Sequence, residues 1–148
     1  MGEKQEDANL ILRLYEIRRD EAMRRARVWF LMDFNPENIQ DIMQALFGEH
    51  SADFRMVASY WDMAATFVNY GAIDEQMFND INTEHVGIYA KLQPFLAELR
   101  ALPGAPPYLY LKNLEPLIQR MPDAEERIAA MRRYMKRRNE ASTGAATS

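Results

Sequence analysis

The spacing of apolar residues divides the chain into six helix-sized segments, and this pattern constrains the fold more than any other feature. Each segment has its own start and stop residues, and nowhere does an alternating apolar pattern continue long enough to indicate a strand. Apolar residues make up 48% of the 148 residues, which is sufficient for one buried core. The sequence therefore predicts a single all-α domain over residues 1–140, folded as an irregular bundle of about six helices.

The boundaries of the predicted helices come from residues that favour helix ends, namely Asp, Asn and Ser at the starts and Gly or Pro near the stops. The six predicted helices run from Asp7 to about Met32, from Asn35-Pro36 to Phe47, from Ser51 to Gly71, from Asp74 to about Leu99, from Asn113 to Met121, and from Asp123 to about Arg138. Small and polar residues follow, so we expect a disordered tail over residues 141–148.

The third predicted helix, from Ser51 to Gly71, is apolar on two faces. A helix of this kind lies either at the centre of a bundle or at a subunit interface. We expect the bundle to pack around this helix and the next one, and we assign the second apolar face to self-association. That face comprises Met56, Tyr60, Met63, Phe67 and Tyr70.

Charged residues are distributed unevenly along the chain. Residues 13–27 and 120–140 each carry a net charge of +3, residues 28–119 carry −8, and the whole chain carries −4. In the first basic segment acids precede arginines by three or four residues, as Asp20 precedes Arg24, and this spacing forms salt pairs along one helix. We therefore expect a self-neutralised, solvent-exposed face there.

The last predicted helix has a basic face with only Glu140 as a nearby acid. Such an amphipathic helix can bind an anionic membrane, nucleic acid or an acidic protein surface, or its cations can simply favour the helix dipole. A net acidic chain without a helix-turn-helix pattern disfavours sequence-specific reading of nucleic acid. The basic residues are Arg132, Arg133, Lys136, Arg137 and Arg138.

No motif for cofactor or metal binding occurs in the sequence. The chain has no cysteine and two histidines, and it lacks paired Glu-x-x-His units, the spaced acids of an EF-hand and a glycine-rich phosphate loop. We therefore expect no cofactor and no metal, and the absence of a recognisable catalytic motif disfavours an enzyme.

Asp62 and His85 are nevertheless candidates for a catalytic role. Asp62 lies in the most apolar helix, so it requires a partner, and an arginine of the first helix is the expected one. His85 lies on an apolar stripe, where it is either a hydrogen-bonded core residue or a base paired with Glu84 or Asp62. A small helical enzyme with a pocket near Asp62 and His85 is thus one alternative function. His50, in a turn, is expected to be solvated.

A segment over roughly residues 60–100 resembles an uncharacterised family of small helical bacterial proteins, catalogued as a domain of unknown function. The resemblance implies no activity and no catalytic residues, but relatives often carry an N-terminal membrane helix. The residues that carry it are Tyr60-Trp61, the turn Gly71-Ala72-Ile73-Asp74, Tyr89 where relatives often have Trp, and the segment from Leu92 through Pro94 to Arg100.

The leading functional hypothesis is a non-enzymatic interaction module that binds a second copy of itself or another protein. The alternatives are a peripheral binder of anionic membrane or nucleic acid, and the small enzyme described above. The start of the chain has neither the basic nor the apolar segment of a signal peptide, so a cytoplasmic location is expected, with membrane-peripheral binding as a further possibility.

Overall fold

Helices form all the regular secondary structure in the computed structural model, which describes residues 2–147. The predicted all-α class is confirmed, but six helices are too few because two predicted helices are broken. The α-helices are α1 (Gly2–Arg18), α2 (Glu21–Val28), α3 (Ile39–Phe47), α4 (Ser51–Asn69), α5 (Glu75–Ile81), α6 (Glu84–Leu92), α7 (Leu96–Arg100), α8 (Leu114–Gln119) and α9 (Ala124–Thr147). A π-helical turn, η1 (Trp29–Asp33), and two 3₁₀ turns, η2 (Gln93–Phe95) and η3 (Pro107–Tyr110), complete the described elements.

The first predicted helix is broken between α1 and α2. Asp20 is the N-cap of α2, because its carboxylate accepts a hydrogen bond from the backbone N–H of Met23 at 3.3 Å. The predicted start at Asp7 is also wrong, since α1 begins at Gly2. The Asp7 carboxylate instead accepts a hydrogen bond from the backbone N–H of Asp74 at 2.9 Å, which fixes α1 to the turn before α5.

The second predicted helix begins three residues later than expected. The side-chain oxygen of Asn38 accepts a hydrogen bond from the N–H of Asp41 at 2.9 Å and caps α3, whereas Asn35 donates to the carbonyl of Met32 at 3.1 Å. The Asp41 carboxylate accepts a hydrogen bond from the N–H of Glu37 at 2.9 Å. These contacts hold the segment between η1 and α3 in a defined path.

The fourth predicted helix is divided into α5, α6 and α7. Asp74 caps α5 as predicted, with the N–H of Met77 donating to its carboxylate at 2.9 Å. Pro94 falls in η2, where the helix changes to a 3₁₀ turn before α7 begins. A proline has no N–H, so the helical hydrogen bond at this position is lost. The carbonyl of Ala90 instead accepts hydrogen bonds from Arg132 of α9 at 3.1 and 3.3 Å.

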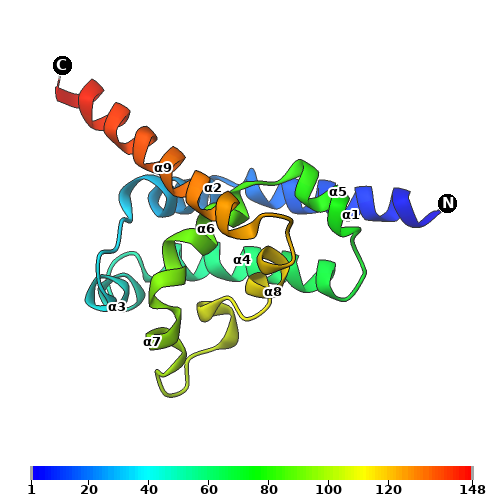
Figure 1. The fold of residues 1–148 in the computed structure, drawn as a ribbon, viewed down its shortest axis with the longest axis horizontal. Helices are drawn as coiled ribbons and strands as arrows, with labels where there is room; N and C mark the ends of the chain where they lie inside the picture. Colours follow the sequence, from blue (N-terminus) through cyan, green and yellow to red (C-terminus); the bar gives the residue numbers. More distant parts are fainter. Residues whose placement is uncertain (1, 148) are drawn as a thin grey trace.

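Helix α4 lies at the centre of the structure, as predicted for the helix that is apolar on two faces. It packs against α2, α3, α8 and η3, and it places Phe54 and Trp61 in the core. In Figure 1, α4 runs through the middle of the molecule. The helix expected to share this central position, α6, packs mainly against α8 and α9.

Helix α9 crosses α6 and then extends away from the other helices, as Figure 1 shows. It continues past Arg138, where the sequence predicted its end, to Thr147. Alanine and glutamate favour helix here, and no proline interrupts the segment. The residues predicted to form a disordered tail, 141–148, are helical as far as Thr147, and Ser148 lies outside the described residues.

Candidate functional site

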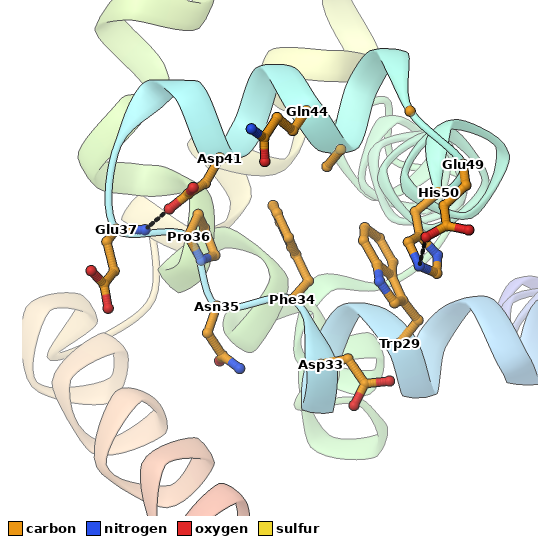
Figure 2. Close-up of a pocket in the computed structure, with 12 residues that line it drawn as sticks. Trp29, Asp33, Phe34, Asn35, Pro36, Glu37, Asp41, Gln44, Glu49 and His50 are labelled. Atoms are coloured by element: carbon orange, nitrogen blue, oxygen red, sulfur yellow. Dashed lines mark hydrogen bonds and ion pairs between the residues drawn. The ribbon is translucent and has the colours of Figure 1, made fainter.

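A cleft between α3 and η1 has an acidic rim. It occupies about 530 Å³, and we call it the acidic cleft. No lysine or arginine lines it. Figure 2 shows Trp29 and Phe34 projecting from the lower helix into the space below α3. The carboxylates that line the acidic cleft are those of Asp33, Glu37, Asp41 and Glu49.

Aromatic rings form the inner wall of the acidic cleft. The Trp29 ring stacks against Phe34 on one side and His50 on the other, with ring centroids 4.9 and 4.5 Å apart. His50 is therefore half-buried in a ring stack, whereas the sequence predicted a solvated loop residue. Its Nδ1 lies 2.9 Å from the Asp53 carboxylate, and its Nε2 lies 3.9 Å from Glu49. These contacts fix the imidazole at one end of the cleft.

The surface predicted for self-association is only partly exposed. Tyr60 is buried, and its hydroxyl donates a hydrogen bond to the carbonyl of Leu14 at 2.6 Å. Met56 is partly buried against the core. Of the five residues, only Met63, Phe67 and Tyr70 are exposed. The five residues therefore do not form one continuous apolar face.

The predicted basic face of α9 is exposed. Arg133, Lys136 and Arg137 make no ion pair within the described side chains, residues 3–142. The guanidinium of Arg138 lies 5.8 Å from the centroid of the Tyr134 ring. Arg132 differs from the others, because it donates to the main chain of α6 and holds the two helices together.

Asp62 and His85 have structural contacts instead of forming a pocket. The Asp62 carboxylate accepts hydrogen bonds from the backbone N–H groups of Asn113 and Leu114 at 2.9 and 3.0 Å, and from the Asn113 side chain at 2.9 Å. The Asp62 carboxylate thus accepts hydrogen bonds from the free N–H groups at the start of α8. The prediction that its partner is an arginine of the first helix is wrong. Asp62 is only 4% exposed and His85 is fully buried, so neither side chain is accessible to a ligand.

His85 is the hydrogen-bonded core residue that the sequence favoured. Its ring stacks on Trp61, with centroids 5.5 Å apart, and its Nε2 lies 3.1 Å from the side-chain oxygen of Asn79. Glu84, one of its proposed partners, binds the Trp61 N–H and Arg27 instead. Burial, and then the charge of Arg18, lower the pKa of His85 to about 3, so the imidazole is neutral near pH 7.

The acidic cleft was not predicted, although its four carboxylates lie within residues 33–49, because the elements that carry them had to be packed before they faced one space. Asp33 ends η1, Asp41 lies in the first turn of α3, and Glu49 lies in the turn before α4. A signal in the sequence was the run of residues 28–54, which contains acids but no lysine or arginine, within the larger segment of charge −8. Among the residues that the structure describes, no group of three or more His, Asp or Glu side chains is placed to hold a metal ion.

A sequence model of one protein family, described as Domain of unknown function (DUF4760), matches residues 5–121. The chain belongs to this family. The DUF4760 segment extends from α1 to just after α8, so α9 follows it. No curated protein and no solved structure shows a significant match to the chain. Across residues 2–147, no helix combines the length and the apolar character needed to span a membrane.

Two residues of the segment that resembled the DUF4760 family meet at one carboxylate. Tyr89 donates its hydroxyl hydrogen to one oxygen of Glu115 at 2.8 Å, and Arg100 binds the other oxygen at 2.7 Å. Glu115 lies in the first turn of α8, so these contacts connect α6 and α7 to α8. Tyr89 and Arg100, which carry part of the resemblance, therefore have a structural role in connecting the helices.

Proposed function

We propose that this DUF4760 protein is a non-enzymatic helical interaction module in which the basic face of α9 from one copy binds the acidic cleft of another. The observation that carries the proposal is the charge complementarity of two exposed surfaces. Within the described side chains, Arg133, Lys136 and Arg137 have no ion pair, and the acids of the cleft form only the ion-pair contact of 3.9 Å between Glu49 and His50. Complementary charges of this kind direct association and orientation.

The shapes of the two surfaces support the same pairing. The acidic cleft is open to solvent between α3 and η1. Lys136 lines a neighbouring pocket together with Glu37 of its own chain, so Arg133 and Arg137 are the cations that the pairing between copies relies on. The end of α9 extends away from the other helices in Figure 1. Tyr134 is 55% exposed on α9 and supplies a large ring beside the cations. A tyrosine among arginines is typical of protein interfaces, since both residue types are enriched there.

The proposal retains self-association but moves it from the predicted apolar face of α4. Tyr60 is buried beneath α1, so that face is too small and too interrupted to bury an interface by itself. The acidic cleft and α9 are present once in each chain. The basic face of each α9 can therefore bind the acidic cleft of the other copy, as a twofold symmetric dimer requires.

Sedimentation velocity of the full chain tests this proposal. We expect dimers at micromolar concentration in 50 mM NaCl, and monomers in 500 mM NaCl because salt screens exposed charges. The double variant Glu37→Lys/Glu49→Lys should weaken dimerisation at least about tenfold, and Arg133→Glu/Arg137→Glu should do the same. A chain that carries all four substitutions should dimerise again, since the charges are then exchanged between the two surfaces.

The control is a matched charge reversal outside both surfaces, Arg13→Glu/Glu98→Lys, which should leave the dimer unchanged. Both residues are exposed. Monomers at every salt concentration, or a fourfold variant that fails to recover dimerisation while remaining folded by circular dichroism, would contradict the proposal.

A second candidate function is peripheral binding of the α9 basic face to an anionic membrane. It is favoured by the exposure of Arg133, Lys136, Arg137 and Arg138 around Tyr134. Flotation with phosphatidylserine vesicles should then occur at low salt, decrease at physiological salt and be lost in Arg133→Glu/Arg137→Glu. The cleft variant Glu37→Lys/Glu49→Lys should retain it, and this difference separates the two candidates. Equal flotation of the wild type and the α9 variant would rule out the membrane candidate.

A further inference from the structure

A second cavity, of about 450 Å³, lies where α1 meets α2. Its lining consists of Tyr15, Arg18, Arg19, Arg24 and Arg27, and it contains no carboxylate. We call it the arginine cavity. Like charges that converge in this way repel one another unless an anion or an acidic side chain compensates them.

One of the four arginines is already compensated and fixed. Arg27 forms a two-point ion pair with Glu84, with nitrogen–oxygen distances of 2.9 Å for both Nε and Nη2. Its Nη1 donates to the backbone carbonyl of Arg18 at 3.2 Å, which satisfies an acceptor at the end of α1. The Trp61 N–H also donates to Glu84, at 3.0 Å. This network forms a rigid side of the cavity.

Arg18 is held by aromatic rings instead of by an acid. Its guanidinium carbon lies 5.2 Å from the centroid of Tyr15 and 5.4 Å from that of Trp61. Contacts of this kind orient the planar group while leaving its N–H groups free. The Arg18 Nε is buried and has no hydrogen-bond partner within the described residues. A buried donor without a partner is costly and requires an acceptor.

The charges of Arg19 and Arg24 are not neutralised along the helix as the sequence predicted. Of the expected pairs only Arg25 with Glu21 forms, at 3.5 Å, and Arg25 does not line the cavity. Asp20, the expected partner of Arg24, caps α2. The broken helix therefore leaves these two guanidinium groups available to a ligand.

The break between the helices also brings the arginines together. Along a continuous α-helix each residue turns by about 100°, so two residues nine positions apart lie on opposite sides. Arg18 and Arg27 have this separation, yet both line one cavity. The cavity thus depends on the tertiary structure and could not be predicted from the spacing of the arginines.

We propose that the arginine cavity binds a phosphate-bearing anion, either a soluble phosphate ester or polyphosphate or the phosphate of a lipid headgroup. A phosphate group accepts two parallel hydrogen bonds from a guanidinium, and its negative charge offsets part of the positive charge of Arg18, Arg19 and Arg24. The volume lies within the range of roughly 300–1,000 Å³ found for small-molecule pockets. Tyr15 is 48% exposed, and its ring lies 5.2 and 5.9 Å from the guanidinium carbons of Arg18 and Arg19, so it positions both cations at the cavity.

Isothermal titration calorimetry of the full chain with sodium pyrophosphate tests the proposal, with NaCl of equal ionic strength as the reference. We expect saturable one-site binding and a raised melting temperature, because a ligand that binds only the folded state stabilises it. Arg19→Gln and Arg24→Gln should each weaken binding roughly tenfold, as expected for loss of a charge-assisted hydrogen bond. Both side chains are exposed, so neither substitution disturbs the core.

The matched control is Arg25→Gln, which removes an equal charge from the same helix but outside the cavity. It should bind pyrophosphate with unchanged affinity. If Arg25→Gln weakens binding as much as Arg24→Gln, or if the wild type binds neither pyrophosphate nor vesicles that contain phosphatidic acid, the proposal is wrong.

The vesicle arm identifies the source of the phosphate. Flotation with phosphatidic acid vesicles that pyrophosphate inhibits, and that Arg19→Gln/Arg24→Gln abolishes, assigns the site to a lipid headgroup. Pyrophosphate binding without such flotation assigns it to a soluble ligand. These variants leave α9 and the acidic cleft intact. The anion-binding proposal can therefore be wrong while the proposed self-association is correct.

Discussion

Burial determines the protonation state of His85. The imidazole is fully buried between Trp61 and Phe78, and its pKa of about 3 lies far below the value of 6.5 expected for an exposed histidine. The unfolded chain therefore takes up a proton below about pH 6.5, whereas the folded protein does so only near pH 3. Since the unfolded state binds more protons in this interval, acidification favours unfolding.

We predict that His85 alone lowers the free energy of unfolding by up to ~1.4 kcal/mol per pH unit as the pH falls from 6 to 4. Urea unfolding at pH 7, 6, 5 and 4 measures this slope. His85→Phe, which retains a ring, and His85→Asn, which does not, should differ in stability at pH 7. Both should nevertheless show a flatter pH dependence than the wild type, and an unchanged slope in both would mean that His85 titrates normally.

Among the helices, the junction of α6, η2 and α9 shows how a side chain of one helix supplies a hydrogen bond that another helix lacks. Pro94 supplies no N–H group, so the carbonyl of Ala90 lacks its usual helical donor. Arg132 reaches this carbonyl from α9 and also donates to the side chain of Gln93 at 2.7 Å. Arg132, which the sequence analysis predicted to bind an anionic surface, therefore has a structural role.

A double-mutant cycle tests this junction. Arg132→Met should destabilise the protein by about 1–2 kcal/mol, because it removes hydrogen bonds to a partly buried carbonyl while retaining the apolar part of the side chain. Pro94→Ala restores an N–H at this position, so Arg132→Met should cost less in that background. Thermal unfolding of the four chains measures the coupling, and additive effects would show that Arg132 does not replace the missing donor.

The helix ends also show which features could be predicted from the sequence. Local signals were sufficient where one residue determines a helix end, as Asp74 does for α5. They were ambiguous at Asp20, which can cap a helix or pair with an arginine four residues later, and only the packed structure selects the first role. Neither cavity was predicted, although each is lined by a short stretch of the chain, because the helix breaks at residues 19 and 20 and after η1 determine which side chains face one another.

The whole molecule depends on α9, although α9 lies beyond the DUF4760 segment. Ile128 and Met135 of α9 are buried in the core. Gly87 of α6 allows the close approach, since a Cβ placed there would lie 3.4 Å from the side chains of both Met131 and Met135. The part of the chain that matches the family therefore buries some of its core residues against a helix that lies outside the match.

We predict that a chain ending at Met121 loses at least about 10 °C in melting temperature, or loses its cooperative transition altogether. Removing buried aliphatic side chains costs roughly 2–5 kcal/mol each, a large part of the total stability of a small domain. Differential scanning calorimetry checks this, with a chain ending at Glu140 as the control, which should melt like the wild type. If the chain ending at Met121 is equally stable, α9 is an accessory helix.

The break between α1 and α2 has a consequence for how this protein and its relatives diverge. The four arginines of the cavity share one lining because the helix is interrupted at residues 19 and 20. A one-residue insertion there, or the loss of the capping residue Asp20, would disperse them without altering a single arginine. Anion binding would then be gained or lost by mutations at positions that touch no ligand. Counting arginines in aligned sequences is therefore a poor guide to which DUF4760 proteins share the site, and the residues of the turn are the better marker.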